Sequence, residues 1–199
     1  MTDFRNNPSI TVRGIRNNNP FNLQKTRIGW QGKVSGNDPR FETFDNIENG
    51  IRAGVIDIVG DIGKDKQNTL SKLMVTFAPE HENDTKLYVN ILSKATGIKP
   101  DEILNPGNKL DIKTIFHLSK AIVKHENGPI QSRFVTDAIL LEGVKRAFES
   151  AAIRAYVTKP VLYSLPVPLP RKTGTTEPGL ITPTIIMILI FSILILLNK

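Results

Sequence analysis

Residues 111–128 read DIKTIFHLSKAIVKHENG, and this segment organises the rest of the chain. Its apolar residues recur at helical spacing, which predicts a helix with one buried face. They are Ile115, Leu118, Ile122 and Val123. Gly128 can adopt the left-handed conformation that ends helices, and Pro129 cannot continue one. We therefore expect a helix over 110–126 with Glu126 in its last turn.

Glu126 occupies an unusual place for a carboxylate, because the negative end of the helix dipole disfavours an anion there. If apolar neighbours also exclude water, the carboxyl group should hold its proton more tightly than an exposed one. A carboxylic acid that stays protonated near neutral pH is what a glycosidic bond needs from a general acid. The alternative interpretation is a surface Glu at a frayed helix end.

Composition limits the classes of function. The chain has 199 residues, no Cys and a formal net charge of +7. The lack of Cys excludes disulfides and thiol catalysis, and the three His residues show no metal-binding spacing, so we expect neither a metal nor a cofactor. A basic protein favours anionic partners such as the acidic bacterial cell wall or anionic lipid. The Lys and Arg residues are scattered and form no basic stripe, so no specific nucleic-acid partner is predicted.

The sequence up to residue 158 predicts one domain with a short arm before it. Residues 1–12 are expected to form a flexible polar arm. Residues 13–46 are rich in Gly, Asn and Pro, which is typical of short strands and turns. Further helices are predicted over 47–63, 69–77, 85–96 and 134–156. The domain over 13–158 should therefore be mainly α with a small strand-and-turn lobe.

The composition changes after residue 158. Five prolines within 159–179 favour an extended linker. Residues 180–197, LITPTIIMILIFSILILL, carry no charge and are long enough for a transmembrane helix. Because two residues follow it and no signal peptide precedes the domain, we expect a single-pass C-terminal anchor. The few flanking charges do not predict its orientation.

Three further segments carry recognisable patterns. They are RGIRNNNPFNL at 13–23 with Trp30-Gln31-Gly32 after it, FETFDNIENGI at 41–51, and FAPEHENDTKLYVNI at 77–91. Taken singly, each has a structural interpretation. The first is a turn built from Asn, which tolerates left-handed backbone; the second is a strand that leads into a helix; the third is a capped helix start.

Together these segments resemble lysozyme-like cell-wall hydrolases, which include lytic transglycosylases, bacterial glucosaminidases and muralytic proteins of phage virions. The phage proteins often carry GIRNNNPGN, then W-x-G, F-x-x-F-D and a Glu-x-Gly-Ile-Arg-Ala helix. The matching residues are 14–22, 30–32, 41–45 and 48–53, with Phe21 where many relatives have Gly. The pattern formed by Ala78, Pro79, Glu82, Asn83, Thr85 and Tyr88 looks like the E-T-x-x-Y-V segment of lytic transglycosylases.

The resemblance implies roles for particular residues. In lytic transglycosylases the catalytic Glu normally ends the first helix, in an E-S-G type motif that precedes the Asn-rich segment. The comparable motif here is Glu126-Asn127-Gly128, far along the chain. The resemblance therefore implies a circularly permuted lysozyme-like α+β fold with Glu126 as the catalytic acid. It also implies that Tyr88 frames this acid, and it assigns substrate-binding or supporting roles to Asn18, Asn19, Trp30 and Glu42.

Two chemical schemes remain open at this point. In a transglycosylase, Glu126 alone would protonate the bond between N-acetylmuramic acid and N-acetylglucosamine and then act as the base. In a hydrolase, a second carboxylate would activate water. The candidates for it are Glu42, Asp45 and Glu48, although Asp45 is also suited to cap the following helix and Glu48 to its first turn.

The sequence thus predicts a membrane-anchored enzyme that cleaves peptidoglycan. Its expected partners are peptidoglycan, a lipid membrane and other virion proteins. The expected location is the internal membrane of a phage virion, where such an enzyme would open the cell wall during infection. An inactive peptidoglycan-binding anchor is the main alternative. A cell-envelope enzyme and a nucleic-acid-binding membrane anchor are the others.

Overall fold

The structure is a computed structural model that describes residues 1–77 and 84–158. The predicted linker and transmembrane segment lie outside the described residues, as do Ala78, Pro79, Glu82 and Asn83 of the sequence pattern. None of the helices formed by the described residues is both long and apolar enough to cross a membrane.

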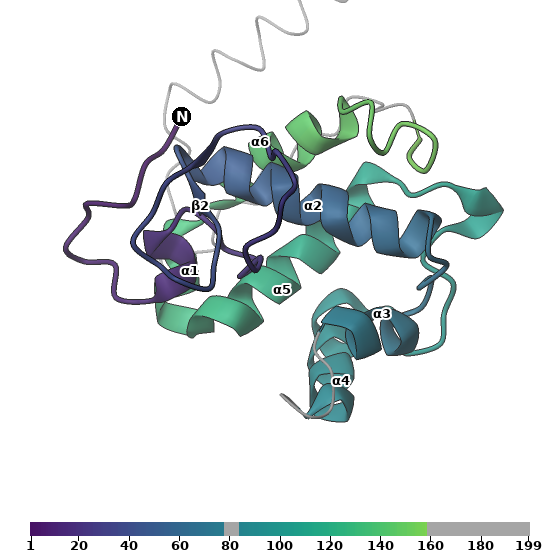
Figure 1. Cartoon of the computed structure of the whole chain (residues 1–199). Helices are drawn as coiled ribbons and strands as arrows, with labels where there is room; N and C mark the ends of the chain where they lie inside the picture. Colours follow the sequence, from purple (N-terminus) through teal and green to yellow (C-terminus); the bar gives the residue numbers. More distant parts are fainter. Residues whose placement is uncertain (78–83, 159–199) are drawn as a thin grey trace, which may run out of the picture. The chain divides into compact units, whose positions relative to one another are not determined.

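The described part of the chain is mainly helical (Figure 1). Its α-helices are α1 (Arg13–Arg16), α2 (Ile47–Gly63), α3 (Leu70–Phe77), α4 (Thr85–Thr96), α5 (Ile112–Gln131) and α6 (Asp137–Phe148). The short 3-10 helices are η1 (Pro106–Asn108) and η2 (Ser132–Phe134). Strands β1 (Lys33–Val34) and β2 (Thr43–Phe44) pair antiparallel, with Lys33 opposite Phe44. The prediction of a mainly α protein with a small strand-and-turn lobe is confirmed.

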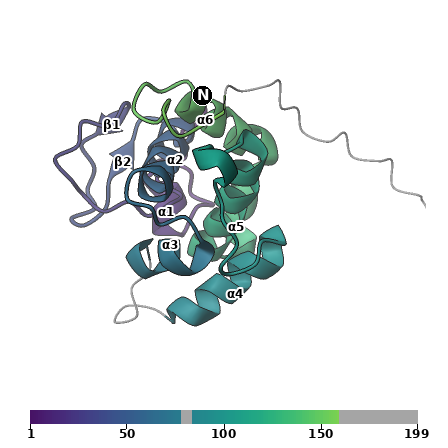
Figure 2. The ribbon, with the colours of Figure 1, turned by 90° about the vertical axis from the view of Figure 1, so that its right-hand side faces the viewer.

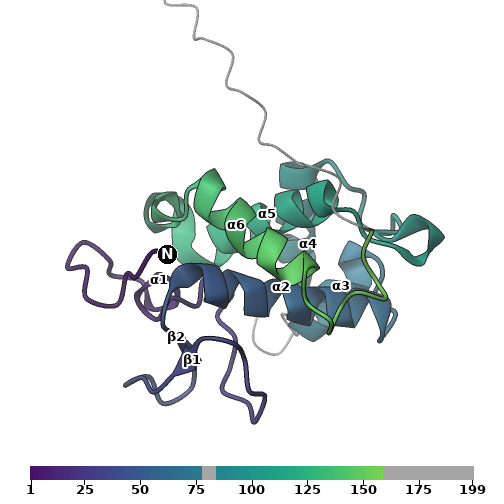
Figure 3. The same cartoon turned by 90° about the horizontal axis from the view of Figure 1, so that it is seen from above.

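Helix α2 is central to the packing, and α6 and α5 lie against one another beside it (Figures 1 and 3). The two strands lie near the N-terminal end of α2 (Figure 3). Helices α3 and α4 lie side by side, and α4 also contacts α5 (Figure 2). This arrangement brings α1, α4 and the end of α5 together, although they are far apart in sequence.

The helix starts follow from capping side chains. The Asn46 side chain accepts a hydrogen bond from the backbone N–H of Asn49 at the start of α2. Asp84 does the same for the N–H of Leu87 at the start of α4, and Gly97 ends that helix with φ 77°. The sequence pointed to Asp45 as the cap of α2. The cap is instead Asn46, whose backbone is extended as an N-cap requires.

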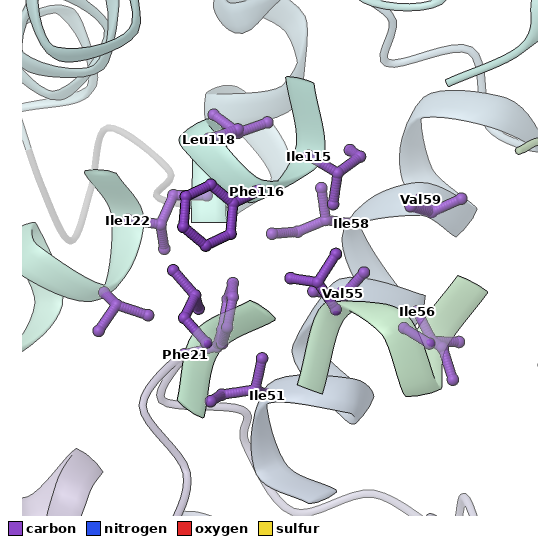
Figure 4. Close-up of a cluster of buried hydrophobic side chains, with 14 of the residues drawn as sticks. Phe21, Ile51, Val55, Ile56, Ile58, Val59, Ile115, Phe116, Leu118 and Ile122 are labelled. Atoms are coloured by element: carbon purple, nitrogen blue, oxygen red, sulfur yellow. The ribbon is translucent and has the colours of Figure 1, made fainter. Parts of the chain in front are cut away.

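Phe21, which lies between α1 and β1, packs in the main core with residues from α2 and α5 (Figure 4). Figure 4 shows Phe21, Ile58 and Phe116 close to one another, and all three are fully buried. Each fully buried apolar side chain of this kind contributes about 1.5–3 kcal/mol through removal from water. The core therefore couples the Asn-rich segment to the two longest helices.

Two glycines in α2 have a packing role that offsets their low helix propensity. A Cβ atom on Gly50 would lie 1.7 Å from the carbonyl oxygen of Asn18. One on Gly54 would lie 2.3 Å from the ring of Phe21. Only glycine lets the Asn-rich segment approach the helix this closely, and this tertiary requirement outweighs a propensity cost of about 1 kcal/mol each.

The segment 1–12 differs from the flexible arm that its polar composition suggested. Phe4 and Ile10 are buried in the core, which removes them from water. The backbone N–H of Thr2 donates to both carboxylate oxygens of Glu48, and the N–H of Ile47 donates to the carbonyl of Thr2. These contacts fix the segment against the start of α2.

The last predicted helix, over 134–156, is shorter in the structure. Helix α6 ends at Phe148, and residues 151–156 form turns. The chain then returns to the start of α5, where Leu110 pairs with Val157 in a parallel bridge. Hydrogen bonds from the N–H of Leu110 to Tyr156 and from the N–H of Thr158 to Leu110 replace the helical ones. The backbone groups are satisfied by this pairing, so the helix need not continue.

Candidate active site

The end of α5 is fixed by Asn127. Its buried side-chain amide donates to the carbonyl of Pro20 at 2.8 Å and to that of Val123 at 2.9 Å. Gly128 has φ 71°, which breaks the helical geometry immediately afterwards, as the sequence predicted. Asn127 therefore ties the final regular turn of α5 to the Asn-rich segment, and Glu126 is held at their junction.

The Glu126 carboxylate accepts one hydrogen bond on each oxygen. Tyr88 Oη donates to Oε1 at 2.8 Å, and Asn22 Nδ2 donates to Oε2 at 2.8 Å. The three residues come from α4, α5 and the segment after α1. Because a carboxylate can accept about four hydrogen bonds, both oxygens keep capacity for a substrate. The carboxyl group is half-buried and has a fixed orientation.

Tyr88 is well suited to hold this carboxylate. Its side chain is buried, and its ring stacks on that of His125 with centroids 3.8 Å apart. Burial raises the pKa of the Tyr88 hydroxyl, and the negative charge of Glu126 and the hydrogen bond to it raise it further. The hydroxyl therefore stays protonated and acts as a donor. The position of Tyr88 agrees with the framing role that the resemblance implied.

Asn22 was inside the Asn-rich pattern but was not singled out from the sequence. Its φ of 53° and that of Asn18, also 53°, show the left-handed backbone that the Asn-built turn predicted. This conformation directs the Asn22 amide to Glu126. Gly14 permits the close approach, because a Cβ there would lie 2.3 Å from Oδ1 of Asn127 and 2.8 Å from Oδ1 of Asn22.

An open cleft of about 510 Å³ contains Glu126 in its wall. Trp30 and Phe41, from the segment that carries the two strands, also line the cleft, which places Trp30 in the same cleft as Glu126. The remaining lining comes from the segment after α1, the lobe and helices α1, α2 and α3. The cleft therefore combines aromatic and polar side chains around Glu126.

Two carboxylates in the cleft were missed at the level of sequence. Asp57 and Asp61 lie one turn apart on α2 and line the same cleft as Glu126. Burial raises the pKa of Asp57. Burial and the charges of Asp57 and Asp65 raise that of Asp61 to about 6. Their spacing at i and i+4 places both acids on one face of α2, but the sequence does not indicate that this face lines a cleft.

Asn18 and Asn19 were predicted to have substrate-binding or supporting roles, and in the structure their side chains contact the surrounding framework. Both are fully buried. Asn18 accepts from the N–H of Phe4 and donates to the carbonyl of Phe44. Asn19 donates to the carbonyls of Leu23 and Glu42 and accepts from the N–H of Leu23. The Asn18 amide also donates to the Asp3 carboxylate, whereas the bonds of Asn19 are all to main-chain groups, and both residues thus shape the turn that presents Asn22.

Glu42, predicted as a supporting residue and a possible second acid, is also buried and occupied. Its Oε1 accepts from the N–H of Thr26 and from Lys33 Nζ, each at 2.8 Å. Glu48 lies in the first turn of α2, as expected, and its carboxylate binds the backbone N–H of Thr2. Asp45 is exposed and accepts from the side chains of Asn46 and Asn49. None of these three acids lines the cleft.

No group of three or more His, Asp or Glu side chains among residues 1–77 and 84–158 could hold a metal ion. Among the described residues, the site presents the carboxyl group of Glu126, which two neutral side chains orient. Asp57 and Asp61 line the same cleft.

Comparison with known proteins adds a relative. No protein-family model matches the chain. The chain is similar to "Protein P5" of Pseudoalteromonas phage PM2, with 31% identity over 142 residues, which cover 69% of this chain and 81% of the phage protein. At this level of identity and coverage, the chain belongs to the same family as Protein P5 of phage PM2.

Proposed function

We propose that this protein is a lytic enzyme that cleaves peptidoglycan, with Glu126 as its catalytic acid. The observation that supports the proposal most is the pair of hydrogen bonds from Tyr88 and Asn22 to the two oxygens of Glu126, beside an open cleft. A surface Glu at a frayed helix end would have no such support. Both donors are uncharged side chains, and together they fix the orientation of the carboxyl group beside the cleft.

The reaction we favour is that of a lytic transglycosylase. Glu126 gives its proton to the glycosidic oxygen between N-acetylmuramic acid and N-acetylglucosamine while the bond from that oxygen to C1 breaks. The resulting carboxylate then takes the proton of the muramic acid 6-hydroxyl as O6 bonds to C1, which regenerates the acid. Tyr88 and Asn22 keep the carboxyl group in place through both steps.

The scheme with a single acid is supported by the positions of the other carboxylates that could activate water. Glu42 and Glu48 are occupied by hydrogen bonds to backbone N–H groups and lie outside the cleft, and Asp45 also lies outside it. Asp57 and Asp61 line the cleft, and burial raises the pKa of both, that of Asp61 to about 6, so they are the carboxylates that a hydrolase would use to activate water. The placement of Glu42, Asp45 and Glu48 is what favours intramolecular ring closure over hydrolysis.

We also propose that the domain is a circularly permuted lysozyme-like fold. Three features support this: the acid at the end of α5, the Asn-rich turn beside it, and the Tyr on α4 that contacts it. Along this chain the acid comes last of the three, whereas in lytic transglycosylases it comes first. Permutation of this kind is physically easy when the chain ends lie close together on the surface.

The biological setting we propose is a phage virion with an internal membrane. The relationship to a phage protein supports the virion. The apolar segment 180–197 would anchor the enzyme in the lipid, and the linker 159–179 would separate it from the domain. Peptidoglycan, the membrane and other virion proteins are the partners of this proposal, which places wall opening at the time of infection.

The proposal is tested by incubating the full-length chain, purified in mild detergent, with purified peptidoglycan and identifying the products by mass spectrometry. Anhydro ends are the expected result and would support a transglycosylase. Reducing ends would instead mean a hydrolase that uses a second carboxylate. Binding without any cleavage would support the alternative of an inactive peptidoglycan anchor.

A further inference from the structure

The acid-base chemistry leaves one prominent residue of the cleft unexplained. Arg13, the first residue of α1, lines the same cleft as Glu126. Its guanidinium carbon lies 3.7 Å from the centroid of the Phe41 ring, and that of Arg40 lies 5.3 Å from the same centroid. Two guanidinium groups therefore lie beside one buried aromatic ring in the wall of the cleft.

The position of Arg13 is fixed without using its terminal donors. The stack on Phe41 holds the plane of the guanidinium, and Nε lies 4.0 Å from Oδ2 of Asp38. The Asp38 carboxylate is itself occupied by the backbone N–H groups of Arg40 and Phe41 and by the Asn17 amide. Among the described residues, the two Nη groups of Arg13 donate no hydrogen bond. They remain available to a ligand, and about half of the side chain is exposed.

A guanidinium group held in this way is suited to a carboxylate, because its planar fork matches the two carboxylate oxygens. The sugar chain of peptidoglycan offers only neutral hydroxyl and acetamido groups, whereas its peptide branches carry carboxylates. We propose that Arg13 binds a carboxylate of the peptide branch and makes the enzyme prefer glycan strands that bear acidic peptides. This inference rests on the proposed function, and it assigns a recognition role that the cleavage chemistry does not require.

The test compares two forms of one substrate. Purified peptidoglycan, free of other wall polymers, is used either untreated or with its peptide carboxylates converted to amides. This conversion removes the charge and keeps the peptide. With the full-length protein in detergent, Arg13→Gln should lower kcat/KM on the untreated substrate about tenfold, the size expected of a charge-assisted pair at a half-exposed site. On the amidated substrate the wild type should fall about tenfold, and the variant should match it within about twofold.

Arg16→Gln is the matched control. Arg16 lies on the same helix, is exposed and does not line this cleft, so its loss should leave both rates unchanged. Arg13→Lys keeps the charge without the fork and should retain part of the preference.

An equal loss for Arg13→Gln on both substrates would overturn the inference, because Arg13 would then act on the fold or on a sugar. A wild type that cleaves neither substrate would instead refute the proposed function itself. The two failures are therefore distinguishable.

Discussion

Replacement of Tyr88 by Phe removes one hydroxyl group and keeps the buried ring, so it isolates the contact that orients Glu126. The hydroxyl donates to Oε1 of Glu126 at 2.8 Å, and the ring stacks on His125. A hydrogen bond to a charged group contributes about 1.5–3 kcal/mol to stability. Because Glu126 is only half-buried, we expect a loss near the lower limit, about 1–2 kcal/mol.

The assay is urea unfolding of residues 1–165, a compact unit that contains all the described residues. With an m-value of about 2 kcal/mol per molar urea, the middle of the range for small proteins, the midpoint should fall by about 0.5–1 M with an unchanged slope. The same substitution in a Glu126→Ala background should cost less than about 0.5 kcal/mol, because the hydroxyl has already lost its acceptor.

Tyr156→Phe serves as the control for this cycle, since it also removes a phenolic hydroxyl but one that donates no hydrogen bond among the described residues. Its effect should lie within about 0.5 kcal/mol of zero. The reasoning is refuted if Tyr88→Phe costs the same with and without the Glu126 carboxylate, because the stabilisation would then come from some other contact of the hydroxyl.

Three further predictions concern Gly14, Gly54 and Asp61. Gly14→Ala puts a Cβ 2.3 Å from Oδ1 of Asn127, so it should displace the Asn-rich turn. The rate of wall cleavage should then fall about 100-fold in a turbidity assay. An unchanged rate would contradict the close packing at Gly14. Gly54→Ala puts a Cβ 2.3 Å from the ring of Phe21 and should destabilise the domain by about 1–3 kcal/mol in urea, against no change if the ring can move aside. Asp61 has a pKa of about 6 against an ordinary 3.8, so the folded state holds this proton more tightly than the unfolded chain does. The free energy of unfolding should therefore fall as the pH rises from 3.8 through 6. Asp61→Asn should remove this dependence on pH, and an unaltered dependence would exclude Asp61 as its source.

Most of the helical architecture was predictable because local signals decided it. The bounds of α2 match the predicted 47–63, and those of α4 match 85–96 with Gly97 after it. Both helices combine a capping side chain with an apolar face, so local preference and burial agree. The last helix was predicted too long because residues 151–157 are rich in helix-forming types, whereas pairing with Leu110 satisfies their backbone in another way.

The site was only partly predictable, and the reason is physical. Glu126 and Tyr88 were identified from the patterns around them, and the structure brings them to hydrogen-bond distance. The choice among the asparagines could not be made in this way. Which of them faces inward depends on the backbone twist at Asn18 and Asn22 and on the approach allowed by Gly14, and these are tertiary features. Asp57 and Asp61 were passed over for the same reason, because only packing shows which face of α2 lines the cleft.

The most direct test of the central claim is the rate at which the full-length Glu126→Gln variant cleaves purified peptidoglycan, beside wild type and Glu149→Gln. Glu149 is exposed and lies outside the cleft, so it controls for the loss of one negative charge. The loss of a general acid costs about 10²–10⁴-fold, and we expect a fall of that size for Glu126→Gln alone. Cleavage by Glu126→Gln at a rate within a few fold of wild type would contradict the assignment of Glu126 as the proton donor.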